Sequence, residues 1–257
     1  MATVVETKKS ETHKEKLGDF LARNPFGQPL TLGFFYREKM RAIHRISPDL
    51  PFKEILEVGG GQGGLTSLLY PQAQITNIDL DPKYANVPCN QQEKVRFICG
   101  DATNLPCENE SFDAVTMFDV LEHIPDHQKA VSEALRVLKP KGFLLVSSPN
   151  ENWRFPYYRV MKPLCPSEAE VMAEWGHVRR GYTLDELTGL IGFPCQSSAT
   201  FINPSTVVCH DVAFSRLSRL KRLFFCTALT PLTWTSYWLH KPESLGTETA
   251  YAWQKPA

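Results

Sequence analysis

The 257-residue sequence has no surplus of charge, because lysine and arginine together number 28 and so do aspartate and glutamate. Nucleic-acid binding usually calls for a basic surplus, so nucleic acid is not the expected partner. The 7 cysteines are odd in number and never spaced as C-x-x-C. This pattern predicts neither a metal site nor a disulfide framework, and it favours a reducing compartment. Residues 1–20 lack the apolar stretch of a signal peptide. We therefore expect a cytoplasmic protein.

A long apolar run is also missing, and the uncharged stretch 223–239 contains Pro231 and several hydroxyls. A membrane-spanning helix needs about 20 mostly apolar residues, so we do not expect one here. The stretch before it has apolar residues at every third position with basic residues between them: Phe214, Leu217, Leu220 and Leu223 with Arg216, Arg219, Lys221 and Arg222. A helix over 214–239 would suit a membrane interface. It would equally suit packing on a sheet edge or on a partner subunit.

Short apolar strands alternate with helices through the middle of the chain. Strands are expected at 54–58, 75–79, 95–101, 112–119 and 142–149, with helices at 65–70 and 130–138. Two helices are expected earlier, at 12–24 and 30–46. A later helix at 183–193 begins with a capping box, and strands follow at 197–202 and 249–255. Such alternation predicts a parallel sheet with helices on both faces.

The stretch from 57 to 66, EVGGGQGGLT, carries two glycine signatures at once. Gly59, Gly61 and Gly64 match the dinucleotide pattern G-x-G-x-x-G, and Gly63 in place of Gly64 gives the pattern of methyl-donor enzymes. Glycine permits the tight turn, and the helix that follows offers free N–H groups to a ligand. Asp79, twenty residues after Gly59, can accept both hydroxyls of a ribose. A dinucleotide such as NAD and the methyl donor S-adenosylmethionine would both explain these residues.

Other residues separate the two cofactors. Glu57, two residues before the first glycine, suits a ligand with an ammonium group, and Asp101 in GDA can accept from an adenine amine. A dinucleotide-dependent oxidoreductase leaves both unexplained. With the ordered motifs E-x-G-x-G-x-G, I-D, G-D-A, F-D-x-V and L-K-P-x-G, residues 55–150 resemble the class I S-adenosylmethionine-dependent methyltransferases, of the small-molecule type.

This resemblance implies a Rossmann-like α/β fold with a seven-stranded, mostly parallel sheet of strand order 3-2-1-4-5-7-6. It implies that S-adenosylmethionine is bound by Glu57, Gly59, Gly61, Gly63, Asp79, Leu80, Asp101, Ala102 and Phe118. Lys141 replaces a glycine common in the family, and some forty residues separate the last two expected strands. The expected organisation is therefore N-terminal helices over the active site (1–50), a cofactor-binding core (51–150), a substrate lid (151–181) and the end of the core (182–257) with an amphipathic insertion at about 205–242.

An acceptor that begins protonated needs a base near the cofactor. His123 and His177 are the candidate catalytic residues, although each could instead pack over the pocket or orient its roof. The lid is rich in aromatic and basic residues that suit a flat or amphipathic substrate. The candidate pocket residues are Trp153, Tyr157, Tyr158, Trp175, Arg179 and Tyr182. The same aromatics could form a small core of their own.

The sequence thus predicts methyl transfer to a small or amphipathic acceptor, on oxygen rather than nitrogen or carbon. The acceptor would be lipid-like if residues 214–239 contact a membrane. Two alternatives stay open, namely a non-catalytic binding or scaffold protein with the same fold and an NAD(P)-dependent oxidoreductase.

Overall fold

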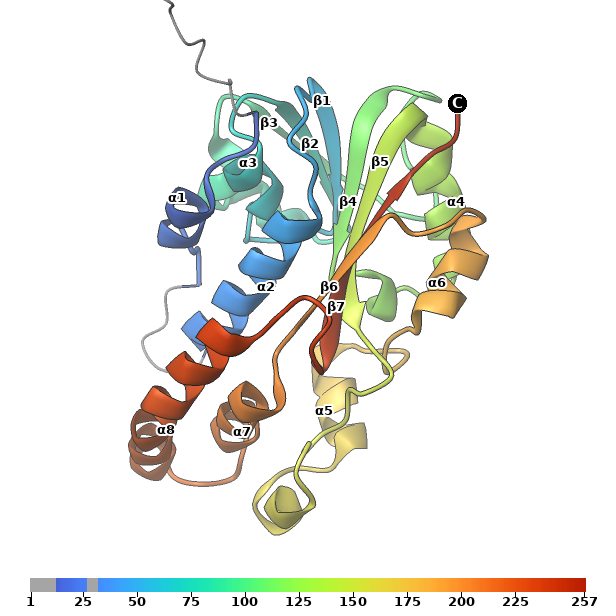
Figure 1. Ribbon diagram of the computed structural model, residues 1–257. Coiled ribbons are helices and arrows are strands. Elements are labelled where there is room, and N and C mark those ends of the chain that lie inside the picture. The colour runs from blue at the N-terminus through green and yellow to red at the C-terminus, as the bar shows by residue number, and fades with distance from the viewer. Residues whose placement is uncertain (1–12, 27–31) are drawn as a thin grey trace, which may run out of the picture.

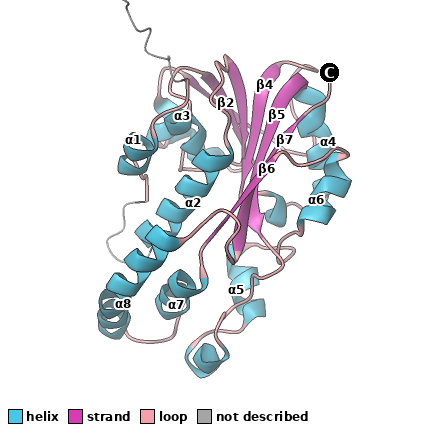
Figure 2. Cartoon of the chain, viewed as in Figure 1, coloured by secondary structure: helices cyan, strands magenta, loops and turns pink. Residues whose placement is uncertain are grey.

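The computed structural model describes residues 13–26 and 32–257. Seven strands form one sheet of order β3-β2-β1-β4-β5-β7-β6, and β7 runs antiparallel to both its neighbours (Figures 1 and 2). The predicted strand order is confirmed. The strands are β1 (Glu54–Val58), β2 (Gln74–Asp79), β3 (Val95–Cys99), β4 (Phe112–Phe118), β5 (Leu138–Pro149), β6 (Ser197–Phe201) and β7 (Glu248–Gln254).

Helices cover both faces of the sheet (Figure 2). One side carries α1 (Leu17–Ala22), α2 (Leu32–Ile46), α3 (Leu65–Leu69), α7 (Pro204–Ala213) and α8 (Arg219–Leu239), and the other carries α4 (His127–Val137) and α6 (Leu184–Ile191). Short 3-10 turns are η1 (Pro82–Asn86), η2 (Pro88–Gln91), η3 (Leu121–His123) and η4 (Arg159–Leu164), and α5 (Glu168–Trp175) lies beyond the carboxyl ends of the parallel strands.

Successive residues of each strand contribute to opposite cores, because side chains alternate across a sheet. In β5, Phe143 and Leu145 pack in the core under α1, α2 and α3, whereas Leu144 and Val146 pack in the core under α4 and α6. Both cores are buried. The near-continuous apolar strands read from the sequence are therefore explained by burial on both faces.

Polar side chains fix the ends of several helices. The capping box of α6 is confirmed, with Thr183 and Glu186 bonding each other's backbone N–H. Asn203 caps α7, and the buried Glu38 carboxylate on α2 accepts from the Asn203 backbone (3.2 Å) and from the Thr206 hydroxyl. These bonds hold α2 and α7 together at the carboxyl edge of the sheet.

Two expectations about helices are wrong. The first N-terminal helix covers only Leu17–Ala22 of the expected 12–24. The apolar–basic stretch that begins at Phe214 is not one helix, because α7 ends at Ala213 and α8 begins at Arg219. The Ser215 hydroxyl donates to the Val212 carbonyl (2.7 Å), a local bond that competes with helix continuation.

The segment 150–181 has a small core of its own, formed by Trp153, Phe155, Cys165 and Val171. The second insertion, between β6 and β7, is the α7–α8 pair. In the ranges that the structure describes, no helix is both long and apolar enough to cross a bilayer. The division into a cofactor core, a lid and a C-terminal part remains a prediction.

Candidate active site

The glycine loop joins β1 to α3 and turns in the left-handed region at three glycines, Gly59 (φ +70°), Gly61 (φ +51°) and Gly64 (φ +56°). A Cβ at Gly59 would lie 2.2 Å from the Val120 side chain, and one at Gly64 would lie 2.5 Å from the Cys89 Cβ. Gly63, by contrast, lines a cavity in front of the loop. Gly64 is therefore required by packing, and Gly63 lines the cavity together with Gly59 and Gly61.

The cavity in front of the loop has a volume of about 440 Å³, and its lining includes Glu57, Gly59, Gly61 and Phe118. The Glu57 carboxylate is buried, and its Oε1 accepts from the Thr66 N–H (3.2 Å) and hydroxyl (2.7 Å). Burial raises the pKa of Glu57, and the bonds from Thr66 oppose that rise. A ligand ammonium would relieve the cost of burying this carboxylate.

A second cavity of about 360 Å³ continues past the ends of β2 and β3, lined by Asp79, Leu80, Asp101 and Ala102 among others. Asp79 is held by the backbone, since Oδ2 accepts from the Gly61 N–H (3.1 Å) and Oδ1 from that of Asp81 (3.1 Å). Leu80 is exposed here and gives the cavity an apolar wall. A fixed carboxylate beside an apolar wall fits a ribose and a flat base.

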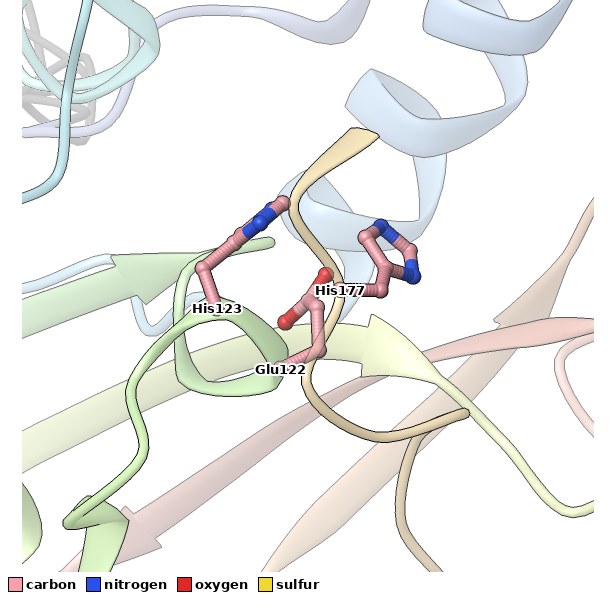
Figure 3. A group of neighbouring side chains, drawn as sticks. All are labelled: Glu122, His123 and His177. Atoms are coloured by element: carbon pink, nitrogen blue, oxygen red, sulfur yellow. The ribbon is translucent and has the colours of Figure 1, made fainter. Parts of the chain in front are cut away.

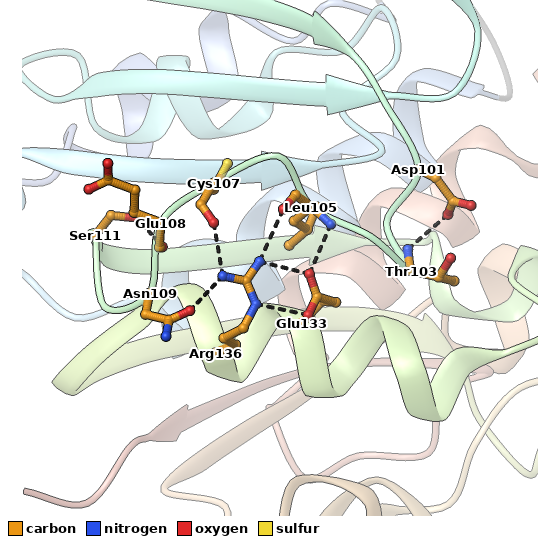
Figure 4. A network of polar contacts seen from close by, with 9 residues as sticks. All are labelled: Asp101, Thr103, Leu105, Cys107, Glu108, Asn109, Ser111, Glu133 and Arg136. Carbon is orange, nitrogen blue, oxygen red and sulfur yellow. Dashed lines mark hydrogen bonds and ion pairs between the residues drawn. The ribbon is translucent and has the colours of Figure 1, made fainter.

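The loop that begins at Asp101 is fixed from below by one arginine (Figure 4). Arg136 on α4 donates to the carbonyls of Leu105 (3.0 Å) and Cys107 (2.8 Å). It also pairs with Glu133 (2.7 Å), whose carboxylate accepts from the Leu105 N–H. The side-chain bond from Arg136 holds the pKa of Glu133 below its usual value. This network orders residues 101–111 and so sets the position of Asp101.

An ion pair lies where β4 ends. Asp119 has a left-handed backbone (φ +51°), and its carboxylate accepts from the Lys39 ammonium on α2 and from the Ser147 hydroxyl on β5, both at 2.5 Å. Burial alone would lower the pKa of Lys39, but Asp119 raises it overall. Glu248 on β7 is close by, and burial together with Asp119 raises its pKa to about 8.

The two candidate histidines meet over the first cavity, with ring centroids 4.8 Å apart (Figure 3). His123 Nδ1 is 3.1 Å from the Gly176 carbonyl, which requires the proton on that nitrogen. Burial, followed by His123, lowers the pKa of His177 to about 4, so His177 is neutral at pH 7. Its buried Nδ1 has no hydrogen-bond partner among the described residues.

Buried Glu122 completes a group with these histidines, and the candidate ligand atoms of all three lie within 4.8 Å of one another. Burial and Asp119 raise the pKa of Glu122 well above its usual value. The group has the spacing of a metal site, although the sequence predicts none. Both histidines also line the cavity, so the structure brings the two candidate catalytic residues to the same place as the candidate cofactor residues.

A third, smaller cavity of about 130 Å³ adjoins the first and shares Tyr36, Lys39 and Asp119 with it. Its other lining residues are Phe35, Phe201, Ile202, His210, Phe214 and Glu248. The walls are therefore mostly apolar and aromatic, with charged groups at the junction. We call this space the junction cavity.

The candidate pocket residues of the lid are dispersed. Trp175 lines the first cavity, and Trp153 is buried in the small core behind it. Tyr157 and Tyr158 line a surface groove, with backbone N–H groups bonded to Asp211 (both 3.0 Å).

Arg179 and Tyr182 both contact the 121–125 segment. The Arg179 guanidinium donates to the Leu121 and Ile124 carbonyls (both 2.7 Å), and the Tyr182 hydroxyl donates to the Leu121 carbonyl (3.1 Å). Neither side chain is among those lining the three cavities described above. They position the segment that carries His123.

Sequence reasoning missed Tyr36, Lys39, His210 and Glu248. These residues come from α2, α7 and β7, and no local motif joins them. Lys39 is one of three charged residues, with Glu38 and Arg41, at buried positions of α2. A charged residue at such a position is rare unless it is paired.

Comparison with known proteins agrees with this geometry. Residues 56–146 match the family model described as a methyltransferase domain. The N-methyltransferase NodS from Bradyrhizobium japonicum, solved with S-adenosyl-L-homocysteine, has a similar fold, with TM-score 0.56 and 16% identity over 94% of this chain and 97% of NodS. Residues 56–146 therefore resemble a methyltransferase domain, and the chain has a fold that a known methyltransferase shares.

Curated relatives match part of the chain. The ubiquinone biosynthesis O-methyltransferase of Coxiella burnetii is 30% identical over 138 residues, which are 48% of this chain and 59% of the relative. The phthiotriol/phenolphthiotriol dimycocerosates methyltransferase of Mycobacterium leprae is 37% identical over 117 residues, 42% of this chain and 43% of the relative. The chain thus spans about three-fifths of the first relative's length and less than half of the second's.

Proposed function

We propose that the protein transfers the methyl group of S-adenosylmethionine to a small or amphipathic, lipid-like organic acceptor, and that the acceptor atom is oxygen. The observation that carries the proposal is the junction cavity, an aromatic and apolar space that shares Tyr36, Lys39 and Asp119 with the cofactor cavity. An acceptor held there would present its reacting atom at the shared residues.

When bound, the cofactor supplies an electrophilic methyl group on a sulfonium, which is transferred in one in-line displacement. The protein's main contribution is to hold the acceptor close and exclude water.

The aromatic rings of Phe35, Phe201 and Phe214 would contact the apolar body of the acceptor.

Removal of the acceptor proton is assigned to His177. It lines the first cavity and is neutral at pH 7, so its imidazole is in the form that accepts a proton. His123 is the second candidate, with Nε2 left as the acceptor nitrogen. Asp119 is less suited to this role, because Lys39 and Ser147 already engage its two oxygens.

The relatives support the class of acceptor without naming it for this chain. One relative is named for ubiquinone biosynthesis and the other for phthiotriol dimycocerosates. The aromatic walls of the junction cavity suit an acceptor with a substantial apolar part. The proposed location remains the cytoplasm, with the acceptor drawn from an apolar environment.

Two experiments test the proposal in sequence. A thermal shift with S-adenosylmethionine, S-adenosylhomocysteine, NAD and NADP in parallel should show stabilisation by the two adenosyl compounds alone. A ligand at one hundred times its dissociation constant adds about 2.7 kcal/mol to the free energy of unfolding. Stabilisation by NAD instead would favour the oxidoreductase alternative.

The second experiment incubates the protein with methyl-labelled S-adenosylmethionine and fractionated lipid and aqueous extracts. Label in an organic-soluble product supports the proposal, and a base-labile methyl ester or a methyl ether identifies oxygen as the acceptor atom. Cofactor binding without transfer to any fraction would favour the scaffold alternative.

A further inference from the structure

Helix α8 exposes an apolar face along its whole length. Leu220, Phe224 and Trp238 are 78%, 68% and 74% exposed. At 100° per residue these three positions fall within about 40° of one another on the helix. The other exposed apolar residues of α8 are Leu223, Phe225, Leu232, Trp234 and Leu239.

The inner face of α8 is the more polar one. Its buried residues are Cys226, Thr233 and Tyr237. Thr233 lies 3.3 Å from the Cys209 thiol of α7, and the Arg41 guanidinium of α2 donates to the Tyr237 carbonyl. A helix on the surface of a protein in water normally has the reverse arrangement. The outer face is therefore suited to an apolar surrounding.

Basic residues lie beside the exposed apolar face of α8. No acidic residue occurs between Asp211 and Glu243, whereas Arg216, Arg219 and Lys221 are all exposed. Next to this end of the helix a surface groove of about 970 Å³ contains Arg154, Arg159, Lys162 and Arg180 with Glu168 and Glu170. Arg180 is paired with Glu168 (2.5 Å) and Arg216 with Glu170 (3.4 Å). The charge on this side is predominantly positive.

We propose that the outer face of α8 docks on an anionic lipid bilayer, with the helix axis parallel to the membrane surface. The apolar side chains enter the interface, and Arg219 and Lys221 lie at the depth of the lipid phosphates. A bilayer fits better than a second copy of the chain, because residues 212–242 offer no carboxylate to pair with these cations.

The docked helix would lie one layer away from the junction cavity. Trp234 on α8 packs edge-on against Phe34 of α2 (4.8 Å between centroids), and the next residue, Phe35, lines the cavity. Helix α7, which contacts α8, supplies His210. Figure 1 shows α2, α7 and α8 grouped on one side of the sheet, beside its carboxyl edge.

The test is co-sedimentation of the full chain with vesicles, without cofactor or acceptor, so that its outcome is independent of methyl transfer. We expect binding to vesicles of phosphatidylcholine with about one-third phosphatidylglycerol, and much weaker binding to phosphatidylcholine alone. Adding salt should reduce the binding, since each cation near an anionic surface contributes about 1 kcal/mol, or roughly fivefold.

Single substitutions locate the contact. Phe224→Ser should lower the vesicle partition coefficient at least tenfold, and Lys221→Ala about fivefold. The matched controls are Leu184→Ser on α6 and Lys129→Ala on α4, which replace exposed residues on the opposite side of the sheet. Circular dichroism and melting temperature should be unchanged in all four variants.

Three results would overturn the proposal. One is equal binding by the Phe224→Ser and Leu184→Ser variants, and another is no vesicle binding by the wild type. The third is a stable wild-type dimer that Phe224→Ser converts to a monomer, measured by light scattering, because a second copy would then occupy this face.

Discussion

The cofactor side of the cavity comes from one continuous stretch of the chain, whereas the acceptor side is assembled from segments far apart in the sequence. Glu57, Gly61, Asp79 and Asp101 follow three adjacent strands, β1, β2 and β3, in order. The junction cavity instead joins α2, β4, β6, α7 and β7. The first arrangement produces motifs that can be read locally, and the second produces none.

The two sides also differ in how their charges are held. Asp79 is fixed by backbone N–H groups, so its position depends on the turn itself. Asp119 is fixed by side chains from two other elements, Lys39 and Ser147. A change in α2 therefore reaches the acceptor side directly, and it also reaches the cofactor cavity through Tyr36 and Lys39, which line both cavities. Substitutions at the cofactor residues and at the acceptor side should therefore have different effects.

The largest effect is expected at Asp79. Asp79→Ala should weaken S-adenosylmethionine binding at least one hundredfold, because two charge-assisted hydrogen bonds to a ribose contribute about 1.5–3 kcal/mol each. Calorimetric titration measures the affinity. Asp81→Ala is the control, since Asp81 is exposed and pairs with Lys83. Equal affinity of the two variants would remove Asp79 from the ribose site.

His177→Ala should lower turnover more than cofactor affinity, although His177 lines the first cavity. We expect turnover to fall tenfold to one hundredfold, the usual range for loss of an acid–base group. Cofactor affinity should change less than twofold. His13→Ala is a control for loss of an imidazole outside the cavity lining. Full turnover with the proposed acceptor would exclude His177 as the base.

Glu248 should make the free energy of unfolding depend on pH. Its pKa is about 8 in the fold, above the usual 4.5, so the folded protein holds a proton that the unfolded chain releases. Stability should therefore be fully retained below pH 4.5 and fall as the pH rises toward 8.

Glu248→Gln should remove that dependence. We expect the variant to gain about 1–2 kcal/mol on the wild type between pH 5 and pH 8, the value being reduced because Asp119 and Lys39 titrate with it. Urea unfolding at the two pH values measures the difference. Parallel stability curves for the two proteins would show that Glu248 carries no shifted proton.

The smallest effect is expected at Arg136, which supports the cofactor side without lining it. Arg136→Met removes the bonds to the 105 and 107 carbonyls and should weaken cofactor binding about threefold to tenfold. Lys129→Met on the same helix is the control. Comparison of the two affinities, with melting temperatures, separates loop order from overall stability.

The sheet order was predicted from the family resemblance, which rests on motifs within residues 55–150, and the structure confirms it. The cofactor residues named from the same motifs stay a prediction. These motifs are local, because β1 leads into the glycine loop and β2 ends at Asp79. The boundary near Phe214 could not be predicted, because helix propensity there is overridden by Ser215 and by packing of the Phe214 ring on Trp175.

The residues of the junction cavity could not be predicted from local sequence patterns, because they lie far apart in the sequence. Lys39 and Glu248 are 209 positions apart, and only the closed sheet brings them together. Of the aromatic lid residues, Trp153 and Trp175 pack in or on the small core, and Tyr157 and Tyr158 line a surface groove. The assignment of the pocket to residues 151–181 stays a prediction, and the pocket between α2, α7 and β7 is a second proposal.

The place of β7 in the sheet has a consequence for how the molecule forms. It is the last strand in sequence, yet it lies between β5 and β6 and supplies Glu248 to the junction cavity. During synthesis, β5 and β6 would wait with unpaired edges until residues 248–254 leave the ribosome. The cofactor loop can form well before that moment, and the acceptor cavity cannot. Assembly of the two sides is thus separated in time as well as in sequence.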